Sequence, residues 1–375
     1  MMDPANSYLG KMLLEEITPV VMVLKTQTVE DSCQKNGLNL VQMLNPFCLF
    51  NNIDVPVRTV NDIPYRLKKF KLRLYYASDI RQPESREAIT NHLKQVFINA
   101  NETEATPDPP QPGNILTVAK TESLPSWFRA FNKELVLAPR FSEHEAVDHP
   151  VACLVVVSSK DEQPINKFID LFNTNQLPSL LNDGAMDPKI LKHYLLVHDN
   201  QDGSSEKAMN LLIEMKSTFG TNDCSLLCIN SGQDGSGNQL DSSWFPYKTD
   251  SPLALNSEDI NEMKELMQDL SSKHIIPHME QKIRLLNQQV SATRKGFRNQ
   301  IKNLWWRKGK EDTPDAPSGG MYTFSSIESQ IRVLGDYAFM LRDYELALSN
   351  YRLLSTDYKL DKAWKRFAGV QVANV

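Results

Sequence analysis

The 375-residue sequence lacks an apolar run long enough to span a membrane. Its best apolar stretch, residues 17–24, is short and contains Pro19. That stretch follows Glu15 and Glu16, whereas a secretory signal peptide begins with positive charge. Only five cysteines are present, an odd number that favours reduced thiols over a disulfide framework. These absences, with 41% apolar and 23% charged residues, predict a soluble cytoplasmic globular protein.

No metal-binding spacing is present either. Cys224 and Cys228 lie four apart in the apolar run CSLLCI, so in a strand they would share one side. No partner ligands follow at a suitable spacing, and we expect buried structural thiols. His144 and His149 superficially resemble a metalloprotease signature, but they are five residues apart where HExxH needs four. We therefore expect a loop that enters a strand at residues 151–157, and no metal.

Nucleotide-binding and catalytic motifs are also missing. There is no GxxxxGK[ST], no GxSxG, and no GxGxxG after a predicted strand; the glycines at 232–237 lie in a Ser/Asp-rich stretch. Residues 166–169 come nearest to a guanine-base motif, but Ile169 stands where the carboxylate is required. His193 and His198 flank an apolar run and are interpreted as strand-edge residues rather than a proton relay. The sequence predicts no enzyme activity, no catalytic residue and no cofactor.

Composition divides the chain at three linkers. Residues 99–126 are rich in Pro, residues 231–255 in Gly, Ser and Asp, and residues 309–324 mix charge, Pro and Gly. The predicted organisation is an N-terminal α/β segment at 1–98, an α/β segment at 127–230 that completes the first domain, a helical segment at 256–308 with a basic amphipathic helix, and the truncated start of an α-solenoid at 325–375.

The fold class follows from hydrophobic patterning. Short β-branched apolar runs predict strands buried on both faces at 19–24, 151–157, 194–197 and 226–229. Helical spacing predicts helices over 165–172 and 206–219, the second with Ser204 or Ser205 as its N-cap. We expect an α/β N-terminal region of mostly buried strands with flanking helices.

After about residue 255 the sequence predicts only helices. One is capped near Ser257, a second covers 277–306 and a third begins near Ser325. Small and aromatic residues of the third region have the spacing of a tetratricopeptide-type hairpin: Leu334, Gly335, Ala338, Asp343, Tyr344, Ala347 and Tyr351. One such repeat cannot bury its own face, so we expect a tetratricopeptide-like solenoid that the chain only begins.

The strongest functional signal is a charge-biased stretch. Residues 281–310 carry nine Lys and Arg and no Asp or Glu, in a chain of formal net charge −5. A roughly seven-residue apolar period leads into Phe297, and Gly296 suggests a bend. Phe297, Ile301, Leu304 and Trp305 share one helical face. The candidate membrane-binding residues are Arg294, Lys295, Phe297, Arg298, Ile301, Lys302, Leu304, Trp305, Trp306, Arg307 and Lys308.

Three interpretations of this stretch compete: a solvated helix packed on its own domain, a nucleic-acid site, and an anionic membrane surface. A nucleic-acid site is disfavoured because no recognisable module accompanies the basic residues. For a membrane, each large apolar side chain contributes about 1.5–3 kcal/mol and each Lys or Arg about 1 kcal/mol. The cost of ordering the helix opposes them. We expect residues 281–293 to pack on protein and residues 294–308 to leave it.

Several strings resemble one family. They are NLVQMLNPF (39–47), PPQPG (109–113), ACLVVVSS (152–159), LKHYLLVHD (191–199), EMKSTFGTNDCSLLCINS (214–231) and IPHMEQKIRLLNQQVSATRKGFRNQIKNLWW (276–306). In order and over nearly the whole chain they resemble the TRAPP (trafficking protein particle) complex subunit 8 family. Members of that family are longer and continue as helical solenoids, whereas this sequence departs from them at 369–375.

The resemblance implies a non-catalytic subunit of a vesicle-tethering and Rab guanine-nucleotide exchange complex. Its partners would be other TRAPP subunits, a Rab-type small GTPase indirectly through the complex, and an anionic membrane surface, but no nucleic acid. It implies roles in ER–Golgi traffic and autophagy, peripherally on Golgi and pre-autophagosomal membranes, with residues 294–308 as the membrane-recruiting helix. The alternative is a nucleotide-free GTPase-like interaction module whose basic helix packs on protein.

Overall fold

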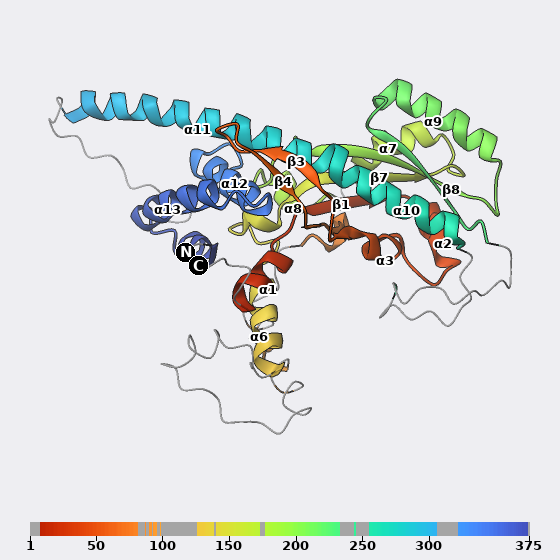
Figure 1. The fold of residues 1–375 in the computed structure, drawn as a ribbon, viewed down its shortest axis with the longest axis horizontal. Coiled ribbons are helices and arrows are strands. Elements are labelled where there is room, and N and C mark those ends of the chain that lie inside the picture. Colours follow the sequence, from red (N-terminus) through yellow and green to blue (C-terminus); the bar gives the residue numbers. More distant parts are fainter. Residues whose placement is uncertain are drawn as a thin grey trace.

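A five-stranded, all-parallel sheet organises the N-terminal part of the chain (Figure 1). The computed structural model describes residues 8–81, 126–138, 140–172, 177–232, 255–305 and 322–373, together with 87, 90, 91, 93–95, 98 and 244. The sheet has the order β6 (Arg73–Tyr76), β1 (Val20–Lys25), β7 (Pro150–Ser158), β8 (Leu191–Asp199), β9 (Cys224–Ile229). Counted along the chain this is the order 2-1-3-4-5 of a doubly wound α/β sheet.

The central strand β7 faces two separate cores, which explains its uninterrupted apolar sequence. Leu154 and Val156 belong to one hydrophobic core, whereas Val155 and Val157 belong to the other. The first core is covered by α2 (Gln27–Gln34), α3 (Leu40–Leu44) and α10 (Ser257–Asp269). The second is covered by α7 (Pro164–Phe172) and α9 (Ser205–Phe219). The predicted α/β layering and the double burial of this strand are confirmed.

Further short elements surround the sheet. The antiparallel pairs are β2 (Leu49–Phe50) with β5 (Phe70–Lys71), and β3 (Val55–Arg58) with β4 (Pro64–Leu67). The additional helices are α1 (Tyr8–Glu16), α6 (Ser126–Leu137) and α8 (Ser179–Asn182), with 3-10 turns at Asn45–Cys48, Ala77–Asp79 and Ala146–Asp148. Trp244, within the stretch predicted as a linker at 231–255, is buried, and its Nε1 donates to the carbonyl of Met43.

Two helix starts differ in detail from the sequence prediction. Ser204 occupies the N-cap of α9, but its side chain makes no capping hydrogen bond. The cap of α10 is Asn256, one residue before the predicted Ser257. Asn256 Oδ1 accepts from the Asp259 N–H at 2.8 Å, and Asp259 Oδ2 accepts from the Asn256 N–H at 3.0 Å. This reciprocal pair satisfies two backbone donors, which a single serine cap would not.

The secondary-structure elements described after residue 255 are all helices. A π-helical segment, Leu270–Ile275, joins α10 to α11 (Ile276–Trp305), and α12 (Ile327–Met340), α13 (Tyr344–Leu360) and α14 (Trp364–Ala373) follow. Helices α12 and α13 pack against each other as a helical hairpin, and its tetratricopeptide type stays a prediction. A Cβ at Gly335 would lie 2.8 Å from Cε1 of Tyr351, so only glycine lets α12 and α13 approach this closely. A continuing solenoid stays a prediction.

A buried ion network ties α12 to the α/β region. Arg332 Nε lies 2.9 Å and 3.0 Å from the two carboxylate oxygens of Asp336, and its Nη2 lies 3.1 Å from Glu145 Oε1, in the loop before β7. The Tyr351 hydroxyl donates to Asp336 at 2.8 Å. Removing one partner from such a network leaves an uncompensated buried charge, which costs about 3–5 kcal/mol.

The buried side chain of His193 makes the stability of the fold depend on pH. It lies buried in β8, 2.9 Å from Ser225 Oγ and with its ring centroid 4.8 Å from that of His274. Burial, with His274 nearby, lowers the pKa of His193 to about 4 from its ordinary 6.5. The folded state therefore favours the neutral ring. The contribution of the neutral His193 ring to the free energy of unfolding is fully present above pH 6.5. It is lost as the pH falls towards 4, which lowers the free energy of unfolding by about 3 kcal/mol.

We expect the free energy of unfolding, measured by urea denaturation, to fall more steeply between pH 6.5 and 4 in the natural protein than in His193→Gln. Glutamine keeps a polar partner for Ser225 but does not titrate. Equal pH dependence of the two proteins would contradict the assignment, whatever their absolute stabilities.

Candidate functional site

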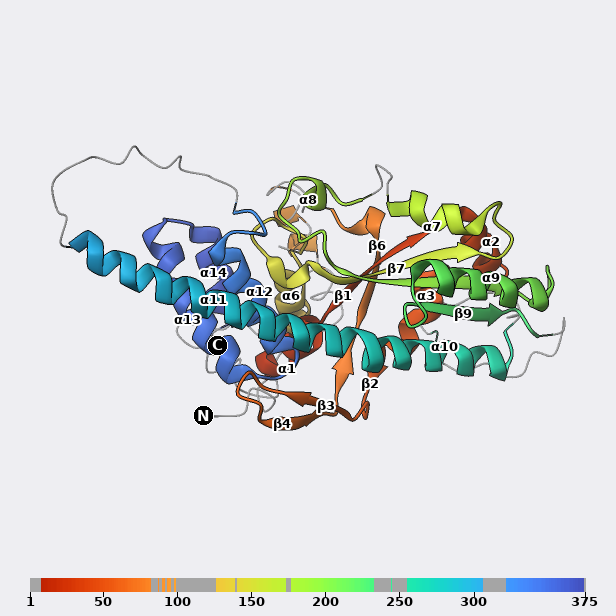
Figure 2. The ribbon, with the colours of Figure 1, turned by 90° about the horizontal axis from the view of Figure 1, so that it is seen from above.

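Helix α11 is the element that carries the predicted site. It contains 30 residues and is therefore about 45 Å long. In both views its C-terminal part extends past α12, α13 and α14 (Figures 1 and 2). None of the described helices, this one included, combines the length and apolarity that crossing a bilayer requires.

The π-helical segment before α11 has a local cause. Pro277 has no N–H to donate, and its ring would clash with the carbonyl four residues earlier in a regular α-helix. The wider π-turn at Leu270–Ile275 relieves that clash, and the chain then continues directly into α11.

The first half of α11 packs on protein, as predicted for residues 281–293. Its buried positions form one stripe: Ile276, Met279, Ile283, Leu286 and Val290. Polar contacts hold the flanks of this stripe. Lys282 Nζ lies 2.6 Å from Asp187 Oδ2, and the backbone N–H of Arg58 in β3 donates to Glu280 Oε1 at 3.2 Å. The direction of α11 is therefore set by the α/β region as well as by α12.

The second half of α11 carries most of the predicted membrane residues. The backbone is helical at Arg294, Lys295, Phe297, Arg298, Ile301, Lys302, Leu304 and Trp305, whose side chains are not described. Trp306, Arg307 and Lys308 lie outside the described residues. Positions 297 and 304 continue the seven-residue register of the buried positions 276, 283 and 290. Their contact with a membrane stays a prediction.

Doubly wound folds bind ligands at the carboxyl ends of their strands, between the first and third strands. In this chain, the carboxylate of Asp161 lies at that edge of the sheet. Asp161 accepts hydrogen bonds from Thr26 Oγ1 at 2.6 Å, Thr28 Oγ1 at 2.7 Å and the Ser158 backbone N–H at 2.8 Å. Thr26 is the N-cap residue of α2. An internal anion thus lies beside the helix N-terminus that favours phosphate in nucleotide-binding proteins.

Charged side chains fill the neighbouring part of this edge. Lys35 Nζ lies 2.7 Å from Asp199 and 2.5 Å from Asp202, and Lys160 also pairs with Asp202. Hydrogen bonds from Lys160 and Lys35 lower the pKa of Asp202 to about 2. His198 Nδ1 lies 2.8 Å from Ser159 Oγ. The charges that could hold a nucleotide are already paired with each other.

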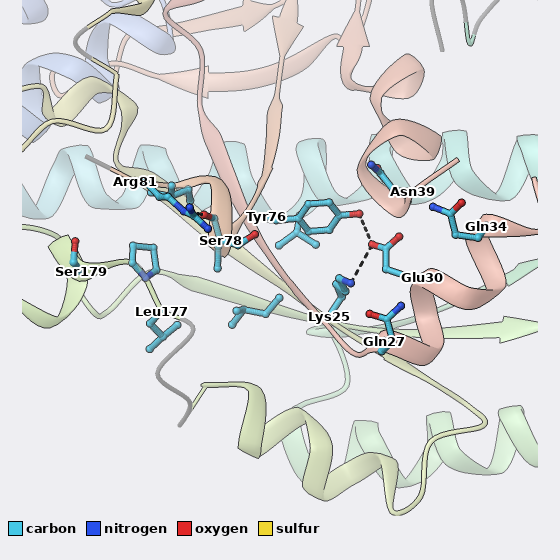
Figure 3. A pocket seen from close by; sticks show the side chains of 15 residues that line it. Lys25, Gln27, Glu30, Gln34, Asn39, Tyr76, Ser78, Arg81, Leu177 and Ser179 are labelled. Carbon is cyan, nitrogen blue, oxygen red and sulfur yellow. Dashed lines mark hydrogen bonds and ion pairs between the residues drawn. The ribbon is translucent and has the colours of Figure 1, made fainter. Parts of the chain in front are cut away.

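A cavity of about 720 Å³ opens beside this edge, between the ends of β1 and β6 (Figure 3). Its polar wall is also internally paired. Lys25 Nζ lies 3.6 Å from Glu30 Oε1, and the Tyr76 hydroxyl donates to the same carboxylate. Burial, together with that hydrogen bond to Glu30, raises the pKa of Tyr76. The Glu30 carboxylate is thus paired within the cavity with Lys25 and Tyr76.

Thiols and histidines lie where structural roles explain them. Cys33, Cys48, Cys153 and Cys224 are buried and Cys228 is half-buried, all unpaired. Burial raises the pKa of the Cys224 and Cys228 thiols to about 11, so they stay protonated. Within the described ranges, no three His, Cys, Asp or Glu side chains converge on a possible metal position. His193 and His198 are near the two ends of β8 and are both buried.

Comparisons of the chain with a family model and with known proteins agree with each other. The family model described as "ER-Golgi trafficking TRAPP I complex 85 kDa subunit" matches residues 13–373. The chain is 25% identical over 247 residues to human trafficking protein particle complex subunit 8, an alignment that covers 63% of this chain and 17% of the relative. It is 25% identical over 370 residues to transport protein particle subunit trs85-2 of Schizosaccharomyces pombe, covering 89% of this chain and 59% of the relative.

A shorter alignment, 30% identical over 118 residues, matches trafficking protein particle complex subunit 8 of Caenorhabditis elegans and covers 28% of this chain and 9% of that relative. The chain therefore spans less than two thirds of each of these relatives.

The edge contacts of Asp161 can be tested by substitution. We expect Asp161→Asn to lower the free energy of unfolding by about 1–3 kcal/mol, because an amide cannot accept all three hydrogen bonds and carries no charge. Asp170→Asn, at an exposed position of α7, is the matched control and should change it by less than about 0.5 kcal/mol. Equal urea midpoints for the two variants would show that the Asp161 contacts contribute nothing.

Proposed function

Since the chain belongs to the family of the TRAPP I complex 85 kDa subunit of ER–Golgi trafficking, we propose that it is a non-catalytic subunit that contributes scaffold and membrane recruitment to a TRAPP-type tethering and Rab guanine-nucleotide exchange complex. Its partners are other TRAPP subunits, an anionic membrane and, through the complex, a Rab-type small GTPase. It acts in ER–Golgi traffic and autophagy, in the cytoplasm and peripherally on Golgi and pre-autophagosomal membranes.

The observation that supports this proposal is the extension of α11 beyond its neighbouring helices. The helix continues to Trp305 and extends past α12–α14 in both views (Figures 1 and 2). Its distal half is rich in Lys and Arg, free of acidic residues, and amphipathic by spacing. A helix of about 15 residues is marginal in water by itself. Here the packed first half already fixes its direction, which lowers the cost of ordering the half that meets the membrane.

A second candidate function is a nucleotide-free interaction module whose basic helix packs on protein. The register of α11 favours it, because the positions that continue into the distal half are those that pack on protein in the proximal half. The internally paired edge around Asp161 fits both candidates, since neither requires a nucleotide.

Membrane binding separates the two candidates. We expect the natural protein to co-sediment with vesicles that contain anionic lipid and Leu304→Asp with Trp305→Asp to abolish this. Two large apolar side chains contribute about 3–6 kcal/mol on burial in the interface, whereas aspartate there adds repulsion from the anionic surface.

The matched control is Asn299→Asp with Asn303→Asp, which makes the same change in formal charge at positions opposite the apolar face by helical spacing. Binding of this control to the vesicles should weaken only by the electrostatic effect of its two added negative charges. If the Leu304/Trp305 variant sediments as well as this control, the helix is not the membrane anchor.

Complex membership is tested independently. We expect core TRAPP subunits to co-purify with the tagged chain, and the Leu304/Trp305 double variant to retain them, because both substituted positions are at the end of α11, which extends past α12–α14. Absence of every core subunit from the natural chain's purification would contradict the subunit assignment.

A further inference from the structure

Strand β9 forms one border of the five-stranded sheet, because it pairs with β8 alone in the strand order (Figure 2). The Tyr194 N–H of β8 donates to the Asp223 carbonyl at 2.8 Å, so the odd-numbered residues of β9 form the ladder to β8. Peptide groups of successive strand residues point to opposite edges. Those of Cys224, Leu226 and Cys228 therefore point to the outer edge of the sheet.

This outer edge is only partly satisfied. The Glu262 carboxylate of α10 accepts from the Cys228 N–H at 3.1 Å. The N–H and C=O groups of Cys224 and Leu226 have no hydrogen-bond partner in the described part of the chain. A row of unpaired backbone groups at a sheet edge is a template for pairing with another strand.

On one face of the sheet, an exposed apolar pair on α9 borders this edge. Met209 is 50% exposed and Ile213 is 64% exposed, although both side chains are large and apolar. Lys216 follows at helical spacing, so the three residues share one side of α9. Burial and Asp223 raise the pKa of the Cys224 thiol, and the nearby charge of Lys216 opposes that rise. The apolar pair therefore lies on the side of α9 that faces the outer edge of β9.

On the other face, carboxylates of α10 border the same edge. Glu258, Glu262 and Glu265 are exposed, and their spacing places them on one side of α10. That side faces β9, because Glu262 contacts the backbone of the strand. Within the described ranges none of the three forms an ion pair, whereas Asp269 of the same helix pairs with Lys273. Their negative charge is available to a cationic partner.

The same carboxylates disfavour a second copy of this chain as the added strand. Two copies paired antiparallel through β9 would be related by a two-fold axis perpendicular to the sheet. Both α10 helices would then lie on one face of the joined sheet, with their exposed carboxylates facing each other. Like charges across an interface oppose binding, so the edge fits a different partner that carries positive charge.

We propose that β9 docks an extended segment of a partner protein, which joins the sheet as an additional strand and alternates apolar with basic side chains. Its backbone pairs with the open groups of Cys224 and Leu226. Successive side chains of a strand point to opposite faces. The apolar residues of the segment therefore contact Met209 and Ile213, and its Lys or Arg residues contact the carboxylates of α10. This surface does not rest on the proposed membrane contact or on complex membership.

The first arm of the test asks whether backbone pairing occurs. The probe is a short synthetic peptide that alternates valine and lysine, labelled and titrated with the full chain by fluorescence anisotropy. The control probe has the same side chains on methylated backbone nitrogens, which cannot donate a hydrogen bond. We expect the control to bind about tenfold more weakly or worse. Amide hydrogen exchange in the segment that contains Leu226 should slow when the unmethylated probe binds.

The second arm tests the apolar pair. We expect Ile213→Asn to weaken binding of the unmethylated probe by about fivefold or more, because a large apolar contact is lost. The matched control is Ile169→Asn, an exposed isoleucine of α7, whose main strand contacts are with β7 and β1. This control should bind the probe like the natural protein. Both positions are exposed, so neither change removes a core side chain.

The third arm tests the charge. Glu258→Gln with Glu265→Gln leaves the Glu262 contact with the Cys228 N–H in place. We expect this variant to bind the probe about threefold more weakly at low salt, with a smaller difference at high salt. Two exposed carboxylates outside α10 give the charge-matched control, Glu162→Gln with Asp170→Asn, which should bind like the natural protein.

The proposal is overturned if the natural protein binds neither probe, if both probes bind equally well, or if Ile213→Asn binds like Ile169→Asn. Equal binding by the two charge variants would contradict a basic partner. Self-association of the natural chain that Ile213→Asn abolishes would also overturn the proposal, because a second copy would then cover the edge. The Leu304/Trp305 variant should bind the probe normally, so failure of the membrane proposal is read separately.

Discussion

The apolar stripe on the first half of α11 holds the described molecule together. Ile283, Leu286 and Val290 belong to one hydrophobic core that extends from Leu154 in the sheet to Tyr351 in α13. Each such side chain contributes about 1.5–3 kcal/mol when it is buried. Without this stripe the C-terminal helices would lose their main contact with the α/β region, and α11 would have no fixed direction. The scaffold and the reach of the basic helix thus depend on the same residues.

Polar contacts add orientation to this packing. Arg332 joins α12 to Glu145 before β7, and Lys282 joins α11 to Asp187 before β8. A buried ion pair adds little net stability over an apolar pair of similar size, but its geometry penalises other arrangements of the helices. Arg332, Lys282 and Asp187 also line a cavity of about 390 Å³ beside the first half of α11.

Local signals in the sequence predicted the elements that local chemistry determines. The run at 151–157 became β7, and the helical spacing at 206–219 became α9. Strand β6 has only four residues, RLYY, and its two tyrosines are half-buried, so no buried-strand pattern marks it. Asn256 was missed as a cap because Ser257 is equally suitable by type and only the backbone conformation decides. Arg332 and Glu145 are 187 residues apart, so their ion pair and the cavity beside it had no sequence signal.

The length of α11 matters because its apolar register does not change along the helix. Positions 297 and 304 lie on the side that packs against protein at 283 and 290, so any surface covering them approaches from the side of α12. If α11 were shorter, the neighbouring helices would block a membrane from reaching that side. The described helix continues through residues 294–305, about 18 Å of helix, and its end extends beyond α12–α14 (Figure 2). Gly296 stands at the start of this part, where a residue without a Cβ lowers the cost of a change in direction. A membrane contact on this face therefore needs both the extension beyond α12 and the rigid packing behind it.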